Sequence, residues 1–179
     1  MKAKRGSGAS AKIWPGDALG VTFQAVPADT RDALRLILDQ SFTGIYLWHA
    51  RRTLRSVAWV REGILEESSI GLTMSTMLGE NIGYVAYEAV APAWRRKGFG
   101  SLLLDDVLQF LQARGASRIL ACVRPENVPS VLLLRSRCFE RITFRSVAHS
   151  RGFPRAVRLW ARMVVAPGEH VYHLNLESP

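Results

Sequence analysis

The alternation of apolar and polar residues predicts strands in the first half of the chain. Residues 20–26 have the apolar content and the branched side chains of a short strand. Three longer strands are expected at residues 55–63, 68–78 and 81–92, where apolar and small residues alternate and turn residues separate the runs. Because strands joined by short turns pair as neighbours, we expect an antiparallel meander.

A helical repeat replaces this alternation in two segments. The first begins at Asp29 or Thr30, either of which can cap a helix, and its apolar residues are Leu34, Ile37, Leu38 and Phe42. The second spans residues 100–114, and its apolar face consists of Leu102, Leu103, Val107, Phe110 and Leu111. Residues 43–54 mix aromatic and basic side chains, so we expect a less regular helix or a loop there.

The second half of the chain predicts helices and strands in turn. Residues 118–123 form a continuous apolar run, as expected of a buried strand, and residues 127–139 form a further helix. Two final strands are expected at residues 141–148 and 157–165, followed by a tail or a short added strand. The predicted fold class is therefore α+β, with helices packed in a sandwich-like arrangement on one central sheet.

The composition fits one folded domain. The chain has 179 residues, of which 48% are hydrophobic, and its formal net charge is +9. We expect a basic flexible arm at residues 1–18, the domain at residues 19–166 and a C-terminal tail at residues 167–179. No apolar run is long enough for a membrane span, and two cysteines make no disulfide framework, which favours a cytoplasmic protein.

Positive charge is concentrated in the arm and in the second half of the chain. Between Arg135 and Arg162 the sequence has eight arginines and one acidic residue, Glu140. Such a surface favours anionic partners, namely cofactor phosphates, an acidic peptide or RNA, whereas the alternative is a solvated face without a partner. His170 and His173 have no cluster of further ligands around them, so we expect no metal.

A glycine pair stands at the start of the second predicted helix. Gly98 and Gly100 follow directly after Arg95, Arg96 and Lys97. A helix N-terminus has free N–H groups and a partial positive charge, and glycine lets a ligand approach the main chain, so a diphosphate is the typical guest. The spacing matches neither the P-loop nor the dinucleotide-binding motif. A capping turn with solvated arginines is the alternative.

The segments around this turn resemble two motifs of the GNAT superfamily of N-acetyltransferases. Residues 84–111 contain the family's Arg/Gln-x-x-Gly-x-Gly/Ala signature as Arg95, Gly98 and Gly100, after a strand that ends in Val-x-Pro. Residues 118–139 resemble the next family segment, in which a strand leads to an Asn and a helix. The resemblance implies a central mixed, mostly antiparallel sheet flanked by helices, with a splay between its fourth and fifth strands.

The same resemblance implies acetyl-CoA as co-substrate and a primary amine as acceptor, which would attack the thioester directly in the splay. The amine could belong to a protein N-terminus, a lysine or a small molecule, and a homodimer would be in keeping with the family. The residues implied in coenzyme binding are Val90, Ala91, Arg95, Arg96, Lys97, Gly98, Phe99, Gly100, Ser101 and Asn127.

The sequence departs from the family pattern where catalytic groups are expected. Leu134 stands where many members have a tyrosine as general acid, and Cys122 stands where relatives that acetylate protein N-termini have a glutamate. Glu88 is the expected base, because simple alternation places it on one side of its strand with Tyr84 and burial raises the pKa of a carboxyl group. The alternative role of Glu88 is an ion pair with one of the arginines. Tyr84 or Tyr87 could donate a proton instead, and a chain of water molecules could also suffice.

The acceptor site is expected between the first helix and the second strand. By resemblance it is lined by Tyr46, Trp48 and His49, although Tyr46 and Trp48 could instead be core aromatic residues. Arg151 and Arg155, which join the last two expected strands, could meet a carboxylate of the acceptor. Two other functions stay open. One is a coenzyme A-binding module without catalysis, which Leu134 favours, and the other is a basic protein that docks on ribosomes or RNA.

Overall fold

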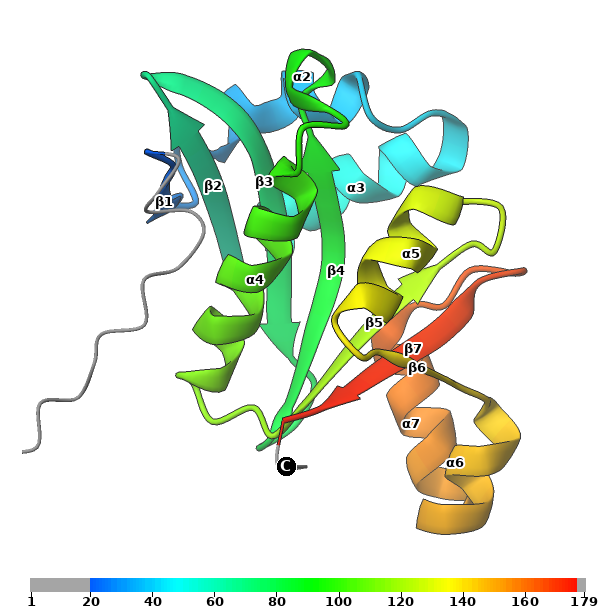
Figure 1. The fold of residues 1–179 in the computed structure, drawn as a ribbon. Helices are drawn as coiled ribbons and strands as arrows, with labels where there is room; N and C mark the ends of the chain where they lie inside the picture. Colours follow the sequence, from blue (N-terminus) through cyan, green and yellow to red (C-terminus); the bar gives the residue numbers. More distant parts are fainter. Residues whose placement is uncertain (1–19, 177–179) are drawn as a thin grey trace, which may run out of the picture.

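The computed structural model describes residues 20–176, so the predicted arm at residues 1–18 lies outside the described residues. Within this part, seven strands form one sheet in the order β1-β2-β3-β4-β5-β7-β6 (Figure 1). The strands are β1 (Thr22–Ala25), β2 (Trp59–Leu65), β3 (Ser68–Met77), β4 (Ile82–Val90), β5 (Arg118–Val123), β6 (Glu140–Ile142) and β7 (His170–Asn175). The helices are η1 (Arg31–Leu34), α2 (Arg35–Asp39), α3 (Gly44–Ser56), η2 (Pro92–Trp94), α4 (Phe99–Gln112), α5 (Val128–Ser136), α6 (Phe144–Arg151) and α7 (Phe153–Met163).

The sheet is mixed and mostly antiparallel, which confirms the predicted fold class. β1 to β4 pair as an antiparallel meander. β4 and β5 are parallel, and β7 pairs antiparallel with both β5 and β6. The last segment, expected as a tail or an added strand, therefore forms β7 in the interior of the sheet.

Helices α4 and α5 pack on one face of the sheet, nearer the viewer in Figure 1. Val107 and Leu111 of α4 are fully buried in a cluster with Val85 of β4 and Ile119 of β5, and Leu134 of α5 joins them. Burying each such side chain contributes about 1.5–3 kcal/mol. This cluster fixes α4, and with it the glycine turn, relative to β4.

Helices α2, α3 and α7 cover the opposite face. Leu38 of α2 and Leu54 of α3 pack in one cluster, and Met163 of α7 packs with Tyr84 of β4 in another. Ala86 contacts both clusters, so they lie on the same face. No helix in residues 20–176 has both the length and the apolar content needed to cross a membrane.

β4 and β5 separate part-way along, as the family resemblance predicted. Their pairing ends at Val85 and Ala121, whereas β4 continues to Val90. The register between β4 and β3 shifts at the same point, and Ala86 is the extra residue of a β-bulge before Tyr87. A bulge exchanges the faces of the residues that follow it. Both features decide which side chains of β4 reach the split.

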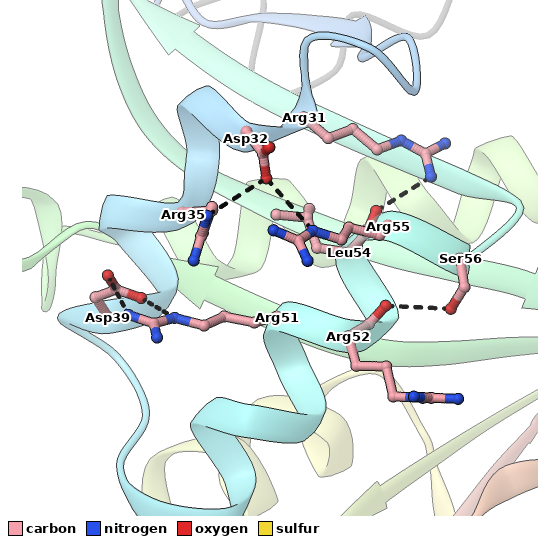
Figure 2. A network of polar contacts seen from close by, with 9 residues as sticks. All are labelled: Arg31, Asp32, Arg35, Asp39, Arg51, Arg52, Leu54, Arg55 and Ser56. Carbon is pink, nitrogen blue, oxygen red and sulfur yellow. Dashed lines mark hydrogen bonds and ion pairs between the residues drawn. The ribbon is translucent and has the colours of Figure 1, made fainter.

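The segment expected as a less regular helix or a loop is the regular helix α3. Ion pairs with the preceding helices hold it, and they join Asp39 to Arg51 and Asp32 to Arg55 (Figure 2). Arg31 is buried, and its guanidinium donates to the main-chain oxygens of Leu54, Val57 and Ala58 at the end of α3. These contacts give carbonyls at the helix end a partner and fix α3 over the split.

The prediction of two final strands at residues 141–148 and 157–165 is wrong, because helices α6 and α7 occupy most of both segments. Thr143 and Ser146 form a capping box that starts α6, since each side chain bonds the other's main-chain N–H. In α7, Pro154 stands in the first turn, and the buried residues Ala156 and Met163 are spaced seven apart. These helical signals outweigh the branched and aromatic residues that favoured strands.

Candidate active site

A cavity of about 910 Å³ occupies the split between β4 and β5. Its walls include β4 from Tyr84 to Glu88 and β5 from Ala121 to Val123. The α4 and α5 side contributes Leu104, Asn127, Ser130 and Leu133. The other side contributes Tyr46, His49, Met163 and Glu169. Because its lining comes from both faces, the cavity passes through the sheet at the split.

The turn before α4 has the backbone that a ligand-binding helix start requires. Gly98 is the N-cap residue and has a left-handed φ of 87°, and Arg96 has a φ of 59°. No atom lies within 4 Å of the position that a Cβ of Gly98 would take. The main chain is therefore open to a ligand at Gly98. Of the expected amides, that of Ser101 is already paired with Gly98 O at 3.0 Å.

The three basic side chains of this turn are placed differently. Lys97 Nζ lies 5.1 Å from the centroid of the Trp94 ring, and Arg96 is exposed. Arg95 instead holds the turn to the body of the protein, because its guanidinium donates to Val90 O at 3.0 Å, Gln40 O at 2.9 Å and Ser41 Oγ at 3.0 Å. Arg96 and Lys97 are thus better placed than Arg95 to meet a phosphate.

The main chain at the end of β4 is partly used within the protein. Val90 O accepts from Arg95, and Ala91 N donates to Ile70 O at 2.9 Å. The edge of residues 86–90 that faces β5 has no strand partner in the described part of the chain. That edge can pair with an extended ligand. The side chain of Phe99 is 7% exposed, so only its main chain can face such a ligand.

Glu88 lies on the α4 side of the split, and the prediction that it shares a face with Tyr84 is wrong because the bulge intervenes. A Cβ on Gly100 would lie 3.1 Å from Glu88 Oε1, so this carboxyl abuts the first turn of α4. Burial, followed by the charge of Asp105, raises the pKa of Glu88 to about 8, while Arg137 lowers it. Arg137 is bound to Asp105 at 2.6 Å. Glu88 is therefore mostly protonated at neutral pH.

A second carboxylate, Glu169, lies on the other side of the split. Tyr46 Oη donates to Glu169 Oε1 at 3.2 Å, and Arg124 Nε donates to Tyr46 Oη at 3.0 Å. The main-chain N–H of Ala166 donates to Glu169 Oε2 at 2.9 Å. These bonds hold the carboxylate in one orientation within the cavity wall. Burial raises the pKa of Tyr46, which stays a neutral donor.

His49 and Tyr87 form a hydrogen-bonded pair beside Glu169. His49 Nδ1 lies 2.7 Å from Tyr87 Oη, and burial, followed by the charge of Glu169, raises the pKa of Tyr87. Trp48 also lines the cavity, but its side chain is 58% exposed. It therefore belongs to the mouth of the cavity. The alternative, that Trp48 packs in the core, is wrong.

Tyr84 and Cys122 form part of the wall on the Glu169 side. Tyr84 Oη donates to Met163 O at 3.0 Å, and burial raises the pKa of Tyr84 well above its ordinary value. Burial also raises the pKa of the Cys122 thiol to about 12. Both groups keep their protons at neutral pH.

The cavity is lined by six of the residues singled out from the sequence, whereas Val90, Ala91 and the turn at residues 95–101 are not among its lining. Tyr46, Trp48, His49, Tyr84, Glu88 and Asn127 all line the cavity, and Asn127 also caps α5 by accepting from Ser130 N. Arg151 ends α6 and is not among the lining residues. Residues 20–176 contain no group of three or more His, Cys, Asp or Glu side chains that could hold a metal ion.

Sequence reasoning missed Glu169 as a site residue. It stands next to His170, the first residue of β7, in a segment that was assigned to the tail. No local pattern identifies it, because its place in the cavity depends on β7 entering the sheet beside β5.

Comparisons with known proteins agree with this architecture. Residues 26–138, more than half of the chain, match the model of the acetyltransferase (GNAT) family. A comparison with curated proteins gives no match.

Solved structures of low sequence identity have the same fold. The ribosomal-protein-S18-alanine N-acetyltransferase from Escherichia coli superposes with a TM-score of 0.64 at 15% identity, over 89% of this chain and 96% of that one. A GNAT family acetyltransferase from Elizabethkingia anophelis, with acetyl-CoA bound, gives 0.64 at 13% identity, over 88% and 99%. The PaiA N-acetyltransferase from Thermoplasma acidophilum, in complex with coenzyme A, gives 0.64 at 8% identity, over 87% and 98%. By its family match, the chain belongs to the GNAT family of acetyltransferases, which are acyl-CoA N-acyltransferases.

Proposed function

We propose that the protein transfers an acetyl group from acetyl-CoA to a primary amine on a protein N-terminus, a lysine or a small molecule. One observation carries this proposal: a cavity passes through the split between β4 and β5 and is lined by residues of α4 and α5 on one face of the sheet and by residues of α3 on the other. A thioester entering from one face can therefore meet an amine entering from the other.

The α4 side suits the coenzyme. The main chain from Gly98 to Gly100 and the side chains of Arg96 and Lys97 would hold the diphosphate, while the unpaired edge of β4 and Asn127 would hold the pantetheine arm. Related folds from Elizabethkingia and Thermoplasma hold acetyl-CoA and coenzyme A. These relatives support the choice of co-substrate.

The reaction is a direct transfer. The amine nitrogen attacks the thioester carbonyl, the new C–N bond forms and the C–S bond breaks. The nitrogen loses one proton and the leaving thiolate gains one. The protein contributes alignment of the two reactants and a place for each proton.

Two carboxyl groups can serve these proton transfers. Glu169, held by Tyr46 and Ala166 on the acceptor side, is placed to take the proton from the amine. Glu88, on the coenzyme side, has its pKa raised to about 8 by burial and is therefore a proton donor for the thiolate at neutral pH. This reverses the role expected for Glu88 from the sequence. The hydroxyl of Tyr84 donates a hydrogen bond to Met163 O, so we assign Tyr84 to the wall of the cavity.

Calorimetry and thiol release together test the proposal. Titration of the full chain with acetyl-CoA should give saturable binding, and release of free thiol should depend on an added amine. Binding without amine-dependent release would favour the coenzyme-binding module that Leu134 suggested. Absence of binding would contradict both functions.

A further inference from the structure

The helical hairpin of α6 and α7 is an extension of the acceptor side of the cavity. It lies between β6 and β7 in the chain and projects beyond the sheet in Figure 1. The end of α7 reaches the cavity, since Arg162, Met163 and Val164 belong to its lining. An acceptor longer than the cavity can therefore continue along α7.

Three arginines follow α7 outward from the cavity. Arg162, Arg158 and Arg155 are exposed and spaced four and three residues apart, so they form one stripe on the helix. The buried residues Ala156 and Met163 occupy a different side. At a rise of about 1.5 Å per residue, the stripe is roughly 10 Å long. This length matches about three residues of an extended peptide.

The charge of this stripe is not neutralised by the described part of the chain. No acidic residue occurs between Arg141 and Gly168. Five arginines elsewhere in the described residues have acidic partners, and Figure 2 shows among these pairs Arg51 with Asp39 and Arg55 with Asp32. Within residues 20–176, none of the three arginines has such an ion pair. Arg162 donates to the main-chain oxygen of Leu78, a neutral acceptor that leaves its positive charge unpaired. The stripe is therefore available to anionic groups of another molecule.

We propose that the acceptor is a polypeptide whose acidic residues, about three to six positions from the acetylated amine, dock on the stripe Arg155–Arg158–Arg162. This inference rests on the proposed function. Guanidinium groups bind carboxylates by paired hydrogen bonds. A polypeptide fits better than RNA, because the stripe begins at the cavity and a polypeptide carries a primary amine and carboxylates on one chain, whereas the standard RNA bases and ribose offer no alkyl amine.

Steady-state kinetics with matched peptides tests this proposal. The first two acceptors are eight-residue peptides with a free N-terminus, one with glutamate and one with glutamine at positions 4–7. A second pair of peptides has a blocked N-terminus and presents the amine on a lysine side chain. A short alkylamine is the fifth acceptor. With saturating acetyl-CoA at low salt, we expect a KM roughly fivefold to tenfold lower for the glutamate peptide, and a smaller difference at high salt.

Charge variants locate the effect. Arg155→Gln with Arg158→Gln should raise the KM of the glutamate peptide to that of the glutamine peptide and leave kcat and alkylamine turnover unchanged. The control, Arg114→Gln with Arg135→Gln, removes equal charge outside the cavity lining and should preserve the preference.

The outcomes separate this inference from the proposed function. Alkylamine turnover with equal KM for both peptides would overturn the inference alone. Tight binding of single-stranded RNA that weakens in the Arg155–Arg158 variant, with no peptide preference, would assign the stripe to RNA instead. Lack of turnover with every amine would overturn the proposed function and the inference with it.

Discussion

Two carboxyl groups, those of Glu88 and Glu169, flank the split in the sheet, and their different surroundings suit different roles in proton transfer. Glu88 lies among apolar groups against α4, near the charge of Asp105, and its pKa is raised to about 8. Glu169 accepts hydrogen bonds from Tyr46 and from a main-chain N–H, which hold its carboxyl group in one orientation. Glu88, which is mostly protonated at neutral pH, therefore suits the proposed role of acid, and Glu169 suits the proposed role of base.

We expect kcat of the wild type to fall as pH rises through about 8, the pKa of Glu88, because the carboxyl group then loses its proton. Glu88→Gln should lower kcat and remove this fall, because glutamine has no proton to lose. The affinity for acetyl-CoA should change little. Thiol release measured from pH 6 to pH 9.5 checks this. A descending limb that persists unchanged in the variant would remove Glu88 from the proton transfer.

The same substitution should change the pH dependence of stability. The pKa of Glu88 is raised from 4.5 to about 8 on folding, so its stabilising contribution is present below pH 4.5 and is lost as pH rises to about 8. Urea denaturation should therefore show that the free energy of unfolding of Glu88→Gln rises relative to that of the wild type as pH increases between these limits. The increase should be on the order of 2 kcal/mol after allowance for solvent screening. A constant difference between pH 5 and pH 8.5 would be inconsistent with the raised pKa.

Glu169→Gln should lower kcat roughly 100-fold, the usual size of a general-base contribution. The thermal midpoint should stay near that of the wild type, because glutamine has the same shape. Tyr46→Phe is the matched variant, since it removes the hydroxyl that orients Glu169 and should cost less. A kcat that is unaffected by Glu169→Gln would exclude Glu169 as the base.

At the scale of elements, a glycine of the same backbone conformation stands at each end of α4. Gly98 precedes the helix and Gly115 follows it, both with a φ of 87° and both with open space where a Cβ would lie. A side chain at either position strains the backbone by a similar amount. Only Gly98 belongs to the turn assigned to the diphosphate.

Gly98→Val should therefore abolish acetyl-CoA binding, whereas Gly115→Val should cost similar stability and leave the affinity unchanged. A branched side chain at residue 98 would cover the main chain that the diphosphate approaches. Calorimetric titration and circular dichroism of both variants check this. Equal affinities in the two variants would contradict the role of the turn.

Most elements with a clear local pattern could be predicted from the sequence, with α6 and α7 as exceptions, whereas the register between strands could not. The meander, α4 and β5 follow from alternation, helical periodicity and a continuous apolar run. The bulge at Ala86 depends on the register with β3, and it overturned the facing expected for Glu88. The strands expected over α6 and α7 were wrong although the capping box at Thr143 and the proline at residue 154 signalled helices.

At the scale of the whole molecule, the sheet separates two binding surfaces. In our proposal the coenzyme binds on the α4 and α5 face, and the acceptor binds on the opposite face, under α3 and α7. The glycine turn before α4 could be recognised from the sequence because its motif is contiguous. The acceptor side combines α3 with a residue beside β7, and only the complete topology brings these segments together.

A crystal structure of the full chain with acetyl-CoA tests the central claim most directly. We expect the diphosphate on the main chain of residues 98–100, the pantetheine along the free edge of β4, and the thioester in the split within reach of both carboxyl groups. Acetyl-CoA bound elsewhere, or bound with its thioester outside the split, would contradict the account.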